Sequence, residues 1–176
     1  MYQFIYQSPL GPMVLLGQDG ALSSIYFLDG QTPPSYPEKE SPDLQAGALW
    51  LRAYFQGDPL ALDGLPLAPQ GTPFQMDVWA LLREIPYGQV TSYGVLARVL
   101  AKKYGREKMS ARAVGAALAK NPLAIVLPCH RVLDGKNFLR GYAWGLERKK
   151  ALLEGEGLKI IQNKVIQPSF ALFKGL

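Results

Sequence analysis

The chain has 176 residues, of which 48% are hydrophobic and 19% charged, so a mainly disordered protein is excluded. No apolar run approaches the roughly 20 residues of a membrane-spanning helix, and we expect no secretory signal in residues 1–8. The net charge of +5 is uneven, because residues 1–70 carry seven acids and two bases whereas residues 71–176 carry seven acids and 17 bases. This asymmetry predicts two units, of which the basic one is a candidate for binding a polyanion such as nucleic acid.

The first part of the chain is typical of a small sheet followed by a helix. Apolar stretches separated by turn residues predict three strands, near 2–6, 13–16 and 21–27. The Pro-rich residues 29–42 predict a loop, and a helix capped by Ser41 or Asp43 is expected to reach Phe55. Residues 57–73 hold four prolines and three glycines, which predicts an extended linker with room for one edge strand.

The second part is expected to be mostly helical. Apolar residues at helical spacing predict helices that open at Thr72-Pro73, at Thr91 or Ser92 and at Ser110, and a fourth helix over 146–153. The second and third of these resemble a helix-turn-helix, although the basic connection between them is longer than the usual turn. The pattern leaves residues 158–176 unplaced.

The helix predicted over 111–120 is thin, because alanine and glycine occupy six of its positions. Such small residues permit close packing against other helices in a core. They also permit insertion into a nucleic-acid groove, with Arg112 projecting from the first turn. The residues alone leave both interpretations open.

Cys129 and His130 are the only residues of their kinds, and they are adjacent. An internal disulfide and a four-ligand Cys/His zinc site are therefore excluded, and a reducing compartment, the cytoplasm, is favoured. Pro128 predicts an extended approach to the cysteine, and the neighbouring His130 and Arg131 predict a lowered thiol pKa. Because side chains alternate along an extended chain, we expect His130 to reach the sulfur through a water unless the backbone turns. The alternative is that Cys129 is a small buried hydrophobic residue.

Residues 128–132, Pro-Cys-His-Arg-Val, match a signature of the O6-alkylguanine-DNA alkyltransferases, and the chain resembles this family of methylated-DNA–protein-cysteine methyltransferases. Further motifs follow in the family's order: Phe74-Gln75, Val78-Trp79, Ile85-Pro86, Gly88, Ser92-Tyr93, Arg112-Ala113-Val114-Gly115, Asn121-Pro122, Tyr142, Gly145-Leu146, Lys149, Leu152-Leu153 and Glu156-Gly157. The resemblance is close over residues 72–157. Residues 1–70 resemble the family's variable N-terminal domain only in their order of strands and helix.

The fold that this resemblance implies is of the α/β (α+β) class. Residues 1–70 would form an N-terminal domain of a small sheet and a helix, ribonuclease H-like, including the linker. Residues 71–157 would form a mostly helical catalytic and DNA-binding domain with a helix-turn-helix or winged-helix-like unit. Residues 158–176 would be a C-terminal tail of unknown role.

The resemblance also implies the reaction. The family repairs DNA by one transfer of an alkyl group, from O6 of guanine and also from O4 of thymine, to its own cysteine after the nucleotide has been flipped out of the duplex. By resemblance Cys129 is the acceptor, His130 is the base acting through a water, and Glu156 is the carboxylate that orients His130. Asn121 would be the hinge between the recognition helix and the active-site strand.

DNA and base contacts are implied in the same way. The DNA-binding residues would be Ser92, Tyr93, Arg112, Ala113 and Gly115. Among these, Arg112 would fill the gap left by the extruded base, and Tyr93 would press on the target phosphate. The pocket residues would be Leu118, Val132, Tyr142, Ala143 and Trp144. Main-chain groups of Cys129, Val132 and Ala143 would read the guanine edge.

The implied partner is double-stranded DNA that carries O6-alkylguanine, bound by a monomer in the cytoplasm, at the nucleoid in a prokaryote or in the nucleus in a eukaryote. No membrane, no cofactor and no metal is implied, since residues 1–70 lack the Cys and His of the family's zinc-carrying members. The connection over 102–109 is longer than in shorter members, and we expect it to widen the DNA contact. Trp144 stands where other members carry a small residue, and it is expected to exclude bulky alkyl groups unless it packs outward.

Two other functions fit parts of the pattern. A helix-turn-helix regulator would bind DNA and use Cys129 only as an alkylation or redox sensor. A cysteine hydrolase would use Cys129 as the nucleophile of a different reaction. Methyl transfer to Cys129 measured beside DNA binding separates these functions.

Overall fold

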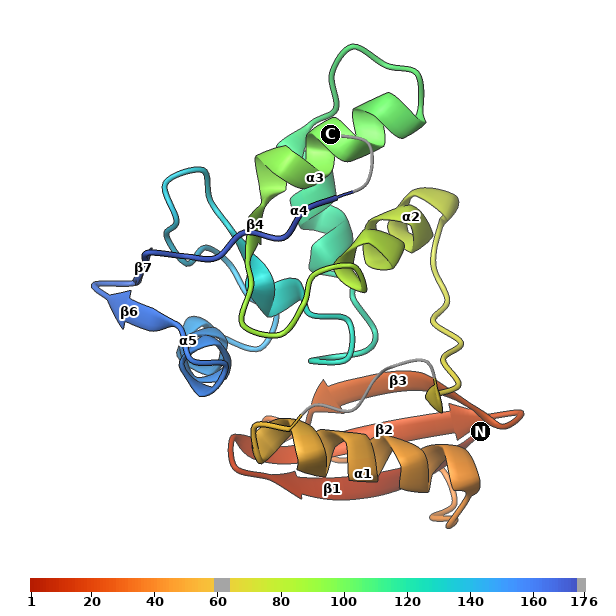
Figure 1. Cartoon of the computed structure of the whole chain (residues 1–176). Helices are drawn as coiled ribbons and strands as arrows, with labels where there is room; N and C mark the ends of the chain where they lie inside the picture. Colours follow the sequence, from red (N-terminus) through yellow and green to blue (C-terminus); the bar gives the residue numbers. More distant parts are fainter. Residues whose placement is uncertain (59–63, 174–176) are drawn as a thin grey trace. The chain divides into compact units, whose positions relative to one another are not determined.

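The computed structural model describes residues 1–58 and 64–173, and the chain divides into two compact units (Figure 1). The first unit comprises residues 1–70 together with 122–126, and the second comprises 71–121 and 127–176. The first contains a small sheet and a helix, and the second is mostly helical, so the expected mixture of α and β structure is confirmed. No helix among the described residues is long and apolar enough to cross a membrane.

The sheet of the first unit has three antiparallel strands in the order β1-β2-β3. They are β1 (Tyr2–Ser8), β2 (Gly11–Gln18) and β3 (Ala21–Phe27). Helix α1 (Pro42–Phe55) packs against the sheet (Figure 1). Gly47 permits this approach, because a Cβ atom there would lie 2.8 Å from Cδ1 of Leu22. Ser41 stands at the N-cap but its side chain makes no capping hydrogen bond, and Pro42 opens the helix.

Two short segments add single bridges to β3. Leu67, in the part of the predicted linker that the structure describes, bridges Leu22, whereas residues 59–63 of that linker lie outside the described residues. The segment 122–126 pairs through Ile25, whose N–H donates to the Pro122 carbonyl at 2.8 Å and whose carbonyl accepts from the Ala124 N–H at 2.8 Å. The sequence had assigned 122–126 to the second domain. The pairing attaches the stretch just before Cys129 to the sheet of the first unit.

The second unit contains a helical core and a set of short strands. Its elements are α2 (Pro73–Leu82), β4 (Thr91–Ser92), α3 (Tyr93–Lys103), α4 (Ala111–Leu118), a 3-10 turn (Cys129–Arg131), β5 (Val132–Leu133), α5 (Leu146–Gly155), β6 (Lys159–Ile161) and β7 (Lys164–Ile166). The predicted caps at Thr72, Ser92 and Ser110 are confirmed, since each side chain accepts a backbone N–H from three residues on. Helix α4 ends at Leu118 rather than Lys120, because its last residues tighten into turns.

Helices α2, α3 and α4 pack together, and β4 pairs with β5 in parallel. The Trp79 indole donates to the Ala117 carbonyl at 3.0 Å, which joins α2 to α4 inside the core. The pairs Thr91 with Val132 and Ser92 with Leu133 bring the N-terminus of α3 beside the end of the Cys129 turn. Residues 159–166, which the sequence left unplaced, form an antiparallel hairpin of β6 and β7.

Candidate active site

Cys129 lies at a cavity of about 1030 Å³ in the second unit. The walls come from the start of α3, the outer side of α4, and the loop that follows β5. The predicted extended approach to the cysteine is wrong, because Pro128 has a ψ of 63° and residues 129–131 form a 3-10 turn in which the Arg131 N–H donates to the Pro128 carbonyl at 3.0 Å. Since the backbone turns, the alternation that separates neighbouring side chains on an extended chain does not apply here.

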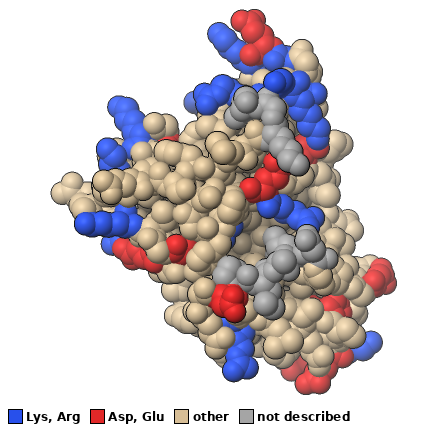
Figure 2. Space-filling view, viewed as in Figure 1, with Lys and Arg blue, Asp and Glu red and all other residues tan. Residues whose placement is uncertain are grey.

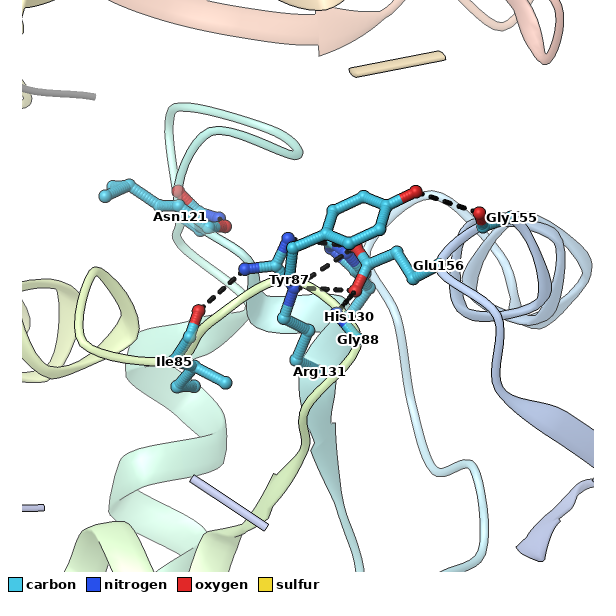
Figure 3. A network of polar contacts seen from close by, with 9 residues as sticks. Ile85, Tyr87, Gly88, Asn121, His130, Arg131, Gly155 and Glu156 are labelled. Atoms are coloured by element: carbon cyan, nitrogen blue, oxygen red, sulfur yellow. Dashed lines mark hydrogen bonds and ion pairs between the residues drawn. The ribbon is translucent and has the colours of Figure 1, made fainter. Parts of the chain in front are cut away.

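His130 and Glu156 meet in the interior of the second unit. Nε2 of the fully buried His130 lies 2.7 Å from Oε1 of Glu156. The same carboxylate accepts from Nε of Arg131 at 2.9 Å and from the Gly88 N–H at 3.1 Å. Figure 3 shows these groups converging on Glu156, with the Arg131 guanidinium reaching on to the Ile85 carbonyl at 2.7 Å. The structure therefore brings together the predicted pair and adds Arg131, which the sequence had placed beside the thiol as a cationic neighbour and not on Glu156.

The charges of this cluster follow from its burial. Burial raises the pKa of Glu156, but His130 and Arg131 outweigh that effect and lower it to about 2. Burial lowers the pKa of His130, so the imidazole is neutral at pH 7. Arg131 is then the counter-ion of Glu156, and the Nε2–H of His130 donates to the carboxylate. In that tautomer Nδ1 is the ring nitrogen that can accept a proton.

The Cys129 thiol is neutral at rest. Burial raises its pKa, and this outweighs the lowering by the Asn121 amide and the Lys149 ammonium. The lowered pKa predicted from the sequence is therefore wrong, because the sulfur is withdrawn from water as well as flanked by cationic residues. Nδ2 of Asn121 donates to the Leu127 carbonyl at 2.7 Å and lies 3.2 Å from Sγ of Cys129. Asn121 thus connects the end of α4 to the turn that carries the thiol.

Lys149 is a fully buried lysine of α5 beneath the cavity loop. Its ammonium donates to the carbonyls of Val132 at 2.6 Å and Arg140 at 2.8 Å, and burial lowers its pKa to about 8. The Tyr93 hydroxyl donates to the same Arg140 carbonyl at 3.3 Å. The sequence had given Lys149 no role, although a charged residue three and four positions before the apolar Leu152 and Leu153 was a visible signal.

The structure places the remaining predicted residues in two groups. Cavity-lining residues are Ser92, Tyr93, Arg112, Gly115, Leu118, Tyr142 and Ala143. Within the part of the chain that the structure describes, Ala113, Val132 and Trp144 are outside this lining. Trp144 packs edge-on against Tyr142, with ring centroids 5.2 Å apart, and so contacts a residue of the cavity wall without lining the cavity itself. The Val132 carbonyl, expected to read the guanine edge, accepts from Lys149 and retains a second lone pair.

The small residues of α4 lie mostly on its exposed side. Val114, Ala117 and Leu118 are buried, whereas Ala111, Arg112, Ala116 and Ala119 are exposed. A Cβ atom added to Gly115 would meet nothing nearer than Tyr93 at 3.8 Å, which is ordinary contact, so helix packing does not require a glycine there. The outer face of α4 is therefore narrow and carries Arg112 beside the cavity. This arrangement favours the groove-binding interpretation over core packing.

Comparison with known proteins finds relatives along both units. The ribonuclease-like domain of 6-O-methylguanine DNA methyltransferase matches residues 1–69, and the DNA binding domain matches residues 73–158. A methylated-DNA–protein-cysteine methyltransferase of Methanosarcina acetivorans is 44% identical over 161 residues, covering 89% of this chain and 99% of that protein. A relative of the same name from Haemophilus influenzae is 35% identical over 166 residues, covering 93% and 90%. The crystal structure of Mycobacterium tuberculosis OGT in complex with DNA has a TM-score of 0.75 and 37% identity, covering 89% of this chain and 92% of that chain.

Proposed function

Because the chain belongs to the 6-O-methylguanine DNA methyltransferase family, we propose that Cys129 is the residue that accepts the alkyl group. The protein is a DNA repair enzyme that transfers an alkyl group from O6 of guanine to its own cysteine. It contains a single cysteine, so that residue is Cys129. The observation that carries the proposal is the position of this thiol at the cavity, in the same turn as a His130 that contacts Glu156.

The chemistry needs a base because the buried thiol is neutral. His130 takes the thiol proton on Nδ1, directly or through a water, and Glu156 stabilises the imidazolium that forms. The thiolate attacks the alkyl carbon, a carbon–sulfur bond forms, and the carbon–O6 bond breaks. The electron pair of the broken bond leaves with guanine, which takes up the proton from the His130 imidazolium, directly or through water. Restored guanine and S-alkylcysteine are the products, and because the thioether is stable each molecule reacts once.

The damaged nucleotide has to leave the duplex, since its O6 substituent is buried in the base stack. We infer that the thin face of α4 lies in the minor groove and that Arg112, exposed in its first turn, fills the gap left by the flipped base. Tyr93 and Tyr142 line the cavity that would receive the base. One chain supplies every residue of this site, so a monomer is sufficient.

The connection between α3 and α4 supplies a further phosphate contact in this proposal. Exposed cations gather there, and Figure 2 shows a group of Lys and Arg side chains over that end of the second unit. Of the exposed cations in this part of the sequence, Lys102 and Lys103 end α3, Arg106 and Lys108 lie in the connection, and Arg112 is in the first turn of α4. Replacing Lys102, Arg106 and Lys108 by alanine together should lower the slope of log affinity against log salt by about two to three. An unchanged slope would show that this loop does not contact the DNA phosphates.

The nucleophile is tested by Cys129→Ala. This variant should bind duplex DNA as the wild-type protein does, because phosphate and groove contacts supply the affinity. It should not remove the methyl group from an O6-methylguanine oligonucleotide. Removal of the methyl group by the alanine variant would contradict the proposal. The need for a reduced thiol also leads us to infer a reducing compartment with access to DNA, such as the cytoplasm.

A further inference from the structure

The C-terminal hairpin has a tight turn and one side chain buried in the core of the second unit. Strands β6 and β7 pair through Ile161 and Lys164, which leaves Gln162 and Asn163 as a two-residue turn. Both turn residues have positive φ, 49° and 59°, as a hairpin turn of this length requires. Val165 of β7 is buried in a cluster of apolar side chains. The other members of this cluster are Val90, Leu133, Leu139 and Leu153.

The hairpin is bonded to the loop that walls the cavity. The Leu139 N–H donates to the Asn163 carbonyl at 2.8 Å, and the Val165 N–H donates to the Asn137 carbonyl at 2.9 Å. Phe138, between the two loop residues, forms a bridge with Lys164. The side chain of Leu139 is buried in the same cluster as Val165. The loop is thus attached to the hairpin by backbone bonds and by packing.

Arg140, the next residue of the loop, links the hairpin to residues that line the cavity. The Arg140 carbonyl, one position after Leu139, accepts from the Tyr93 hydroxyl and the Lys149 ammonium. Tyr142 and Ala143 follow within three residues and line the cavity. A shift of Leu139 would therefore move the acceptor that holds Tyr93 and the wall that Tyr142 forms.

Residues 169–171, which follow the hairpin, bond to the backbone that leads to the opposite wall of the cavity. The Val90 N–H donates to the Ser169 carbonyl at 2.9 Å, and the Ala171 N–H donates to the Val90 carbonyl at 2.9 Å. Val90 directly precedes β4, which leads into Ser92 and Tyr93 at the cavity. The C-terminal segment therefore bonds to Val90, just before the α3 wall of the cavity, and to the loop that forms the other wall.

We propose that residues 163–171 are a positioning element that sets the distance between the two walls of the alkyl-acceptor cavity. These residues touch neither the sulfur nor DNA in the proposed function, on which this inference rests. Their effect is on the geometry in which the base is presented to Cys129. A misplacement of about 1 Å between reacting groups can cost on the order of 100-fold in rate.

Val165→Ala tests the proposal, with Ile160→Ala as the matched control. Ile160 packs against the same cluster but lies on β6, whose residues make no backbone bond to the loop among the described residues. Both variants should lose some thermal stability. Below the melting temperatures of both, Val165→Ala should transfer methyl groups on the order of tenfold more slowly than Ile160→Ala, from duplex DNA and from the free base alike. Affinity for duplex DNA should be the same in both.

Hydrogen exchange distinguishes a local effect on the cavity loop from a general loss of stability. The Leu139 amide should exchange faster in Val165→Ala than in Ile160→Ala, while the amides of α2 and α3 remain equally protected in both. Equal transfer rates and equal Leu139 exchange in the two variants would overturn the positioning role. Failure of the wild-type protein to transfer a methyl group to Cys129 would instead contradict the proposed function, so the two failures are distinguishable.

Discussion

His130 and Glu156, 26 positions apart in the chain, are joined by a 2.7 Å contact that is closed off from water. The carboxylate also has a permanently charged partner, because Arg131 lies 2.9 Å from its other oxygen. His130 can therefore stay neutral at rest and accept a proton only when the thiol is to be activated. Arg131 thus frees His130 to act as a base in the proposed mechanism.

Glu156→Gln should slow methyl transfer by about 10- to 100-fold, because an amide stabilises the imidazolium of His130 less well. The variant should also be destabilised by about 3–5 kcal/mol, since Arg131 would keep a buried charge without its counter-ion. Single-turnover rates and denaturant unfolding check both effects. Glu154→Gln, on the exposed side of α5, is the control and should change neither.

Stability should fall as the pH is lowered from 7 to 3. Glu156 has a pKa of about 2 in the folded chain against an ordinary value of 4.5, so its stabilising effect is complete above pH 4.5 and is lost as the pH falls toward 2. The lowered pKa of His130 acts in the same direction, because the unfolded chain takes up a proton below about pH 6.5 that the folded chain resists. Melting temperatures across this range check the prediction. In Glu156→Gln the loss between pH 4.5 and 3 should be smaller, and an identical profile would assign the acid sensitivity to other groups.

Arg112→Ala should slow repair of duplex DNA more than reaction with the free methylated base. An inserted side chain matters only where a stacked and paired base has to be replaced. Lys120→Ala, at the other end of the α4 segment and also exposed, is the control for charge. Equal losses on duplex and free base would show that Arg112 serves the cavity or the fold instead.

Trp144→Gly should raise the rate with O6-benzylguanine relative to O6-methylguanine. Trp144 contacts Tyr142 but does not line the cavity, so we expect it to act by holding the Tyr142 ring in place. Removal of the indole would let that ring move back and relieve overpacking of a bulky alkyl group, which typically costs about 1–3 kcal/mol. The ratio of the two rates in wild type and variant is the measurement. An unchanged ratio would show that Trp144 does not influence which alkyl group fits.

Local signals predicted much of the fold. The hydroxyl caps of α2, α3 and α4 lie within three residues of the N–H groups that they accept, so Thr72, Ser92 and Ser110 were readable from the sequence. The alternation of β1 and the turns on either side of β2 are equally local. Cys129 and His130 were found because they are the only residues of their kinds and because of the signature around them.

Long-range contacts account for what the sequence did not predict. The hydrogen bond between Pro122 and Ile25 joins residues almost 100 positions apart, and no local sequence pattern predicts it. The buried charges of Arg131 and Lys149 are acceptable only because Glu156 and the carbonyls of the cavity loop meet them in the folded chain. The raised pKa of the Cys129 thiol likewise depends on burial, which its cationic neighbours in the sequence could not reveal.

The most direct test of the central claim is mass spectrometry of the wild-type protein after incubation with a duplex that holds one O6-methylguanine. We predict that the peptide containing Cys129 gains the mass of one methylene, with no more than one per chain, and that the DNA regains guanine. Duplex binding without any gain on that peptide would contradict the account and would instead favour a DNA-binding sensor.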